Sequence, residues 1–99
     1  MNALDTFRTE VPEVAQAFDS LIDSLINTDG LDARTKQLLY IGLKASAGDA
    51  PAVVFHAQMA KGLGATRKEV RDAIVLTLSV CGLVGVATCL QPALEAYDL

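Results

Sequence analysis

The run from Ala73 to Gln91 contains no charged side chain, and it restricts the fold more than any other feature of the sequence. A chain with such a run either spans a membrane with it or buries it against other protein. The polar and small residues Thr77, Ser79, Gly82 and Gly85 lower its hydropathy, and the two glycines indicate a break between two shorter helices. We therefore expect packed helices and no membrane span.

The apolar content exceeds what one small core can bury. Hydrophobic residues make up 52% and charged residues 20% of a 99-residue chain, a length that allows a single domain, 1–99. A chain this short buries a smaller share of its surface than a larger domain does. The surplus apolar surface therefore predicts a homo-oligomer, and the sequence does not choose between a trimer, a hexamer and other ring sizes.

Charge and cysteine usage argue against several classes of protein. The formal net charge of −4, with no basic patch, argues against nucleic-acid binding. The first residues show no basic segment followed by an apolar one, so no signal peptide is expected. On one helix Cys81 and Cys89 would lie about 12 Å apart, too far for a disulfide. These features predict a cytoplasmic protein with reduced thiols.

Helical periodicity dominates the chain, and the alternating pattern of strands is missing. We expect an all-α bundle of about five helices. N-caps, a first-turn proline and helix-ending glycines predict their approximate bounds as 12–26, 32–47, 49–62, 66–81 and 85–97. From Leu38 onward the second of these has Lys44 as its only charge, so we expect it to be buried on nearly all sides.

Four segments follow one another from about Leu31 to Leu99. A buried helix containing 36–43 precedes a helix with His56; then come Gly64-Ala65-Thr66-Arg67-Lys68-Glu69-Val70 and the Cys81-Gly82 bend. The third segment is similar to a Gly-Ala-Thr-x-x-Glu-Ile helix start. In this order the segments resemble the carboxymuconolactone decarboxylase-like family, which includes the alkylhydroperoxidase D-type proteins. The resemblance implies an oligomeric, alkylhydroperoxidase D-like fold.

The peroxidase members of this family use a Cys-x-x-Cys pair, a His four residues after its second Cys, and a Glu twelve residues before its first. Counting back from His56, these positions hold Ala52, Asp49 and Gln37. Peroxide reduction needs a thiolate nucleophile and a resolving thiol, which Ala52 and Asp49 do not supply. Thiol-dependent peroxidase activity is therefore not expected. Decarboxylase members generally lack the pair as well, and keep the His and a Cys-Gly bend.

His56 is the only histidine and the candidate catalytic residue, because an unperturbed imidazole titrates near neutrality. A core histidine bonded to a carbonyl is the alternative. Gln37, Tyr40 and Lys44 share one helix face, which in this fold should look toward the His56 helix. Gln37 and Tyr40 would form a pocket wall there. The simpler interpretation makes Tyr40 a packed aromatic and lets Lys44 extend to solvent.

Two further residues are pocket candidates with structural alternatives. Asp49 suits a helix N-cap better than a catalyst, and Cys81 suits a small hydrophobe in a helix interface better than a pocket thiol. One histidine without clustered carboxylates or thiols gives too few ligands for a metal site, and no cofactor is expected. A pocket, if formed, should lie between the Gln37 and His56 helices, near Cys81.

Two function classes stay open. The first is a lyase acting on a small anionic lactone or related acid, with His56 as proton donor. The second is a non-catalytic binding or scaffolding oligomer of the same fold. Arginines that could hold an anionic ligand are scarce between residues 32 and 99, which counts against the first class. A closed polar pocket at His56 would favour the enzyme, and a dry packed core would favour the scaffold.

Overall fold

The computed structural model describes all residues from 1 to 99, and they form helices and connecting turns with no strand. The expected all-α class is confirmed. The chain divides into two compact units, residues 1–30 and residues 31–99. None of its helices has the length and apolar content that crossing a membrane requires.

The first unit contains two helices. α1 (Ala3–Glu10) begins with a capping box between Asn2 and Asp5, and α2 (Pro12–Ile26) has its proline in the first turn, where a missing N–H costs no hydrogen bond. The helix expected at 12–26 is confirmed as α2. α1 was not expected, because a helix this short carries too few apolar residues to show a period.

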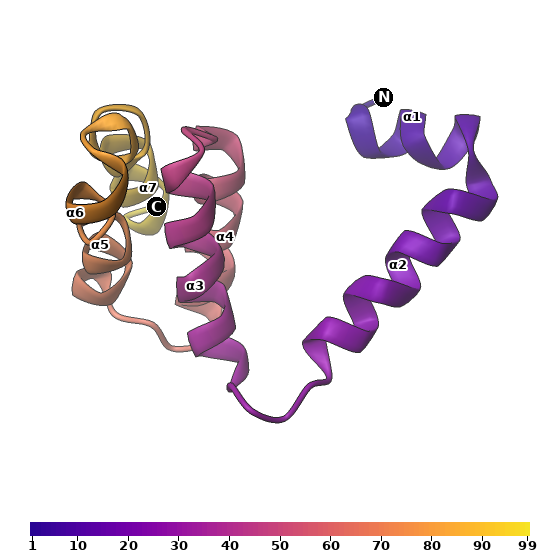
Figure 1. The fold of residues 1–99 in the computed structure, drawn as a ribbon, viewed down its shortest axis with the longest axis horizontal. Helices are drawn as coiled ribbons and strands as arrows, with labels where there is room; N and C mark the ends of the chain where they lie inside the picture. The colour runs from indigo at the N-terminus through magenta and orange to yellow at the C-terminus, as the bar shows by residue number, and fades with distance from the viewer. The chain divides into compact units, whose positions relative to one another are not determined.

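In the second unit, α3 packs against α4 on one side and against α5 on another, and α7 packs against α4 and α5 (Figure 1). The elements of this unit are α3 (Ala33–Ser46), α4 (Ala50–Gly62), α5 (Arg67–Val75), α6 (Leu78–Cys81), the π-helix η1 (Val86–Leu90) and α7 (Gln91–Tyr97). α3 therefore presents two separate faces to its neighbours, one to α4 and one to α5.

The helix expected at 66–81 is interrupted after Val75. The buried hydroxyl of Thr77 donates to the carbonyl oxygen of Ile74 at 2.6 Å, a local bond that competes with continuation of the helix. α6 follows as a single turn, and the residue after it is Gly82, whose φ of 74° is accessible mainly to glycine. The bend expected at Gly82 to Gly85 is therefore present, but a second break precedes it.

The core of the second unit is built largely from small side chains. Ile41, Ile74, Val53 and Val70 are its largest fully buried aliphatic side chains, and alanines and Cys89 fill the space between them. Small residues let helix backbones approach closely, but they bury little area per residue. The expectation that α3 is buried nearly all round is not met in the single chain, where Leu43 is 65% exposed.

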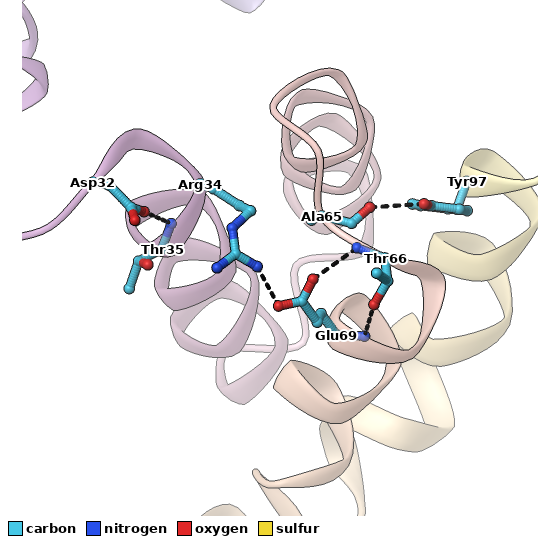
Figure 2. Close-up of polar contacts among 7 residues, drawn as sticks. All are labelled: Asp32, Arg34, Thr35, Ala65, Thr66, Glu69 and Tyr97. Atoms are coloured by element: carbon cyan, nitrogen blue, oxygen red, sulfur yellow. Dashed lines mark hydrogen bonds and ion pairs between the residues drawn. The ribbon is translucent and has the colours of Figure 1, made fainter.

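A polar network joins the start of α3 to the start of α5 (Figure 2). Thr66 and Glu69 form the predicted capping box: the backbone N–H of Glu69 donates to the Thr66 hydroxyl at 3.1 Å, and the Thr66 N–H donates to the Glu69 carboxylate at 2.8 Å. The same carboxylate pairs with the Arg34 guanidinium. These contacts hold the pKa of Glu69 below its usual value, the Thr66 backbone bond most strongly. The network ties two helices together at one end.

Candidate functional site

Neighbouring faces of α3 and α4 bring His56 to Gln37. His56 Nδ1 lies 2.8 Å from Gln37 Oε1, a hydrogen bond between side chains nineteen positions apart. Both residues are partly buried. The face shared by Gln37 and Tyr40 on α3 therefore looks toward the His56 helix, as the resemblance to the family implies.

Two aromatic rings flank the imidazole. Tyr40 stacks on it with ring centroids 5.1 Å apart and an interplanar angle of 28°, and Phe55 meets it edge to face at 5.2 Å. Phe55 was not among the predicted site residues. In the sequence Phe55 is a large apolar residue directly before His56, and such a residue can equally belong to the hydrophobic core. In the structure Phe55 is 58% exposed, so it borders the imidazole at the surface.

The contact with Gln37 determines which imidazole nitrogen is free. A Gln37 carbonyl oxygen can only accept, so Nδ1 carries the proton in this arrangement and Nε2 is left as the free ring nitrogen. Burial lowers the pKa of His56 below 6.5, and the Lys44 ammonium lowers it further, while Asp49 opposes this shift. The imidazole is therefore mostly neutral near pH 7.

Asp49 and Lys44 form a charged pair beside this cluster. Asp49 is the N-cap of α4, where its carboxylate accepts from the Ala52 N–H at 3.2 Å. Its other oxygen lies 3.7 Å from Lys44 Nζ, and both side chains are about half exposed. The N-cap interpretation of Asp49 is confirmed. Lys44 is partly exposed, as the simpler interpretation expected, and is also paired.

Cys81 lies apart from this cluster. It lines an apolar groove of about 570 Å³ on the other face of α3, between α3 and the α5–α6 segment. Neither His56 nor Gln37 lines this groove. The pocket expected between their helices near Cys81 is therefore a different place from the groove that Cys81 lines. The structure thus brings together Gln37, Tyr40, Asp49 and His56, and separates Cys81 from them.

The two thiols differ in accessibility. Cys81 is exposed and Cys89 is buried, and both are free. Burial raises the pKa of the Cys89 thiol, with a smaller contribution from the Asp49 carboxylate. A buried thiol with a raised pKa forms little thiolate and reacts slowly. No three side chains of the His, Cys, Asp and Glu types lie close enough together to hold a metal ion.

Comparison with known proteins identifies relatives by sequence and by structure. The model of the carboxymuconolactone decarboxylase family matches residues 12–95. The crystal structure of a carboxymuconolactone decarboxylase family protein from Legionella pneumophila is similar, with 29% sequence identity and a TM-score of 0.84. That match covers 96% of this chain and 84% of the other. No curated protein matches the sequence.

Proposed function

Because the chain belongs to the carboxymuconolactone decarboxylase family, we propose that it is a lyase acting on a small anionic lactone or related acid, with His56 as proton donor. The observation that carries this proposal is the hydrogen bond of 2.8 Å between His56 Nδ1 and Gln37 Oε1. It fixes the ring orientation and leaves Nε2 as the nitrogen that exchanges a proton with a ligand.

The chemistry requires one proton transfer. When the carboxylate leaves as carbon dioxide, the electron pair of the broken carbon–carbon bond stays on the substrate carbon. The imidazolium of His56 donates its Nε2 proton to that carbon and becomes neutral, and solvent then restores the proton. The lowered pKa of His56 makes the imidazolium a stronger acid, although it also reduces the protonated fraction near pH 7.

Lys44 is the cation best placed to attract an anionic substrate to this site. Its 3.7 Å pair with Asp49 is long and about half exposed to solvent. Such a pair contributes little free energy, so exchange of Asp49 for a substrate carboxylate costs little. The ring faces of Tyr40 and Phe55 would contact the apolar part of a small substrate.

A His56→Gln variant tests the proposal, with Gln58→Leu on the same helix as the control. We expect wild-type protein to bind and turn over a member of a panel of small anionic lactones and acids. His56→Gln should lower the rate by about 10²–10⁴-fold, the usual effect of removing a general acid. Gln58 is exposed and has no assigned contact with the site, so its replacement should leave the rate unchanged. Turnover that persists in His56→Gln would refute the proposal.

A scaffolding role is the second candidate, and one observation favours it. The cavity of about 570 Å³ does not include His56, whereas an enzyme site usually lies in a pocket that excludes water. A scaffold predicts that no panel member binds and that His56→Gln changes only the thermal midpoint. Ligand binding that disappears in a variant of unchanged stability would exclude this alternative.

A further inference from the structure

Two polar contacts between α3 and α4, which lie side by side (Figure 1), share one register. Gln37 meets His56, and Lys44 meets Asp49, so the two contacting residues on each helix are the same number of positions apart. That spacing is about two helical turns, or about 10 Å along the axis. Tyr40, which stacks on His56, comes between Gln37 and Lys44 on α3. The charged pair and the imidazole therefore belong to one continuous surface.

The two members of the charged pair differ in their freedom to move. Asp49 Oδ1 accepts from the Ala52 N–H at 3.2 Å, and Asp49 Oδ2 lies 3.7 Å from Lys44 Nζ. The N-cap bond to Ala52 fixes the carboxylate at the start of α4. The ammonium of Lys44, in contrast, is carried on a flexible four-carbon stem. Lys44 can therefore leave Asp49 without loss of the helix cap, and Asp49 stays behind.

The pair acts on the imidazole with opposite signs. Burial lowers the pKa of His56 most strongly, the Lys44 ammonium lowers it further, and the Asp49 carboxylate raises it. α3 also supplies the Tyr40 phenol, which is neutral near pH 7. η1 supplies the Cys89 thiol, whose pKa is raised by burial and by Asp49, so it is neutral as well. α5 and α7, which also pack against α4, add no charge that acts on His56.

This resting balance opposes the proposed reaction, because a neutral imidazole has no Nε2 proton to donate. A substrate carboxylate that pairs with Lys44 adds one negative charge beside His56, while the charge of Asp49 remains in place. A nearby negative charge favours the imidazolium. For unit charges about 10 Å apart at an effective dielectric constant of about 20, the pKa rises by about one unit. The substrate itself can therefore correct the balance.

We propose that Asp49 is an internal competitor for Lys44, and that a substrate carboxylate which takes its place on Lys44 brings the charge that protonates His56. The inference rests on the proposed function and deepens it, since only an anionic substrate converts His56 into a donor. The proton comes from solvent, and at most one is taken up for each carboxylate bound. Asp49 is a positioning residue, because it acts through Lys44 and not on a substrate atom.

The test is an NMR titration of the His56 imidazole protons with benzoate and with benzamide at constant ionic strength. Benzoate is ionised throughout the titration, and its ring suits the faces of Tyr40 and Phe55. Benzamide has the same ring without the charge. We expect saturating benzoate to raise the pKa of His56 by about one unit. Benzamide should leave it unchanged. Neither measurement requires turnover.

Three variants separate the roles of the charges. Lys44→Gln should raise the pKa of His56 without any ligand and abolish the response to benzoate. Lys68→Gln removes the same charge from an exposed position on α5 and should behave as the wild type. Asp49→Asn keeps an N-cap oxygen and removes the competitor. It should lower the pKa of His56 and bind benzoate roughly two- to fivefold more tightly, the usual range for an exposed ion pair.

The proposal is overturned if benzoate leaves the pKa of His56 unchanged, or raises it equally in Lys44→Gln. An equal response to benzamide would also overturn it, because the charge would then play no part. Turnover of a lactone by a protein that shows no benzoate effect would leave the lyase activity standing and refute this coupling. A benzoate effect that depends on Lys44, in a protein without turnover, would support the coupling and refute the lyase activity.

Discussion

His56 is restrained on several sides, and each contact affects its titration. Gln37 holds one nitrogen, Tyr40 covers one ring face, and Phe55 borders the ring edge to face. Partial burial makes the charged form unfavourable, and the nearby Lys44 ammonium adds to this effect. The protonation of this single side chain therefore links pH to stability and to the proposed chemistry.

The lowered pKa of His56 predicts an acid-sensitive contribution to stability. Above pH 6.5 the imidazole is neutral in the folded and unfolded states, so this contribution is fully present. As the pH falls below 6.5, the unfolded chain takes up the proton first, and the free energy of unfolding decreases until the folded pKa is passed. Denaturant titrations between pH 8 and pH 5.5 should show this decrease in wild-type protein. An equal decrease in His56→Gln would contradict the assignment to His56.

Gln37→Glu should raise the pKa of His56. The substitution keeps the shape of the side chain and places a carboxylate where an amide oxygen now lies 2.8 Å from Nδ1. An opposite charge at this range favours the imidazolium and shifts a pKa by about 1–3 units. NMR titration of the imidazole protons measures the shift, and the exposed position Gln58→Glu on α4 serves as control. A pKa that does not change would show that Gln37 is not the partner in solution.

Thiol-dependent peroxidase activity should be absent. The positions four and seven residues before His56 hold Ala52 and Asp49, and Asp49 is occupied as the N-cap of α4. Of the two thiols, Cys89 is buried with a raised pKa, and Cys81 lies in the groove away from His56. An assay with an organic hydroperoxide and a dithiol should give background turnover. Turnover that Cys81→Ser abolishes would reveal a relocated active thiol.

Residue spacing predicted part of the candidate site. Positions three apart on a helix share a face, which places Gln37 and Tyr40 together, and the resemblance to the family implied that this face looks toward His56. The position of Cys81 could not be inferred in this way. It depends on which face of α3 the segments α5 and α6 pack against, and packing between helices determines that face. Phe55 was missed for a related reason, since its exposure depends on what α4 packs against.

At the scale of elements, helix caps and turns were easier to predict than whether a helix runs on without a break. Asp32, Asp49 and Thr66 are N-caps because each has a short polar side chain directly before a helical segment. The break after Val75 was missed. A threonine such as Thr77 within an apolar run can lie in a continuous buried helix or at an interruption, and the sequence does not distinguish the two. The fifth helix was expected as one element, and it begins instead as the π-helix η1.

Gly85, in the α6–η1 region, should resist replacement by alanine for steric reasons. Its backbone is helical, with φ of −65°, so alanine is conformationally allowed. A Cβ there would lie 2.8 Å from the Thr77 hydroxyl and 3.0 Å from the Ala45 carbonyl oxygen, which belongs to the backbone of α3. Overpacking of this kind costs about 1–3 kcal/mol, so we expect Gly85→Ala to lower the thermal midpoint.

Gly62→Ala is the matched control for Gly85→Ala. Gly62 is the last residue of α4, and a Cβ added there meets nothing within 4 Å. Alanine favours the helix and restricts the unfolded chain, so this substitution should raise stability by about 0.4–1 kcal/mol. If both variants changed the midpoint equally, the close approach between α3 and Gly85 would not explain the effect.

At the scale of the whole molecule, composition and structure lead to the same expectation by different routes. The sequence has more apolar residues than one small core buries, and the structure shows many of them on the surface. The all-α class could be read from helical periodicity alone. The positions of the apolar side chains left outside the core could not be read from the sequence, because composition does not say which side chains lie on the surface. The homo-oligomer stays a prediction.

Association should make thermal stability depend on protein concentration. If folded chains associate through the groove and unfolded chains do not, mass action stabilises the folded state as the logarithm of concentration increases. For a domain of this size about 1 kcal/mol moves the midpoint by roughly 4–8 °C. The wild-type midpoint should therefore rise measurably over about a hundredfold range of concentration in calorimetry or circular dichroism. In Leu43→Glu the midpoint should be the same at every concentration, because this variant lacks the apolar contact but keeps the core of Ile41, Val53 and Ile74. A wild-type midpoint that is independent of concentration would mean that folding of this chain does not involve a second copy.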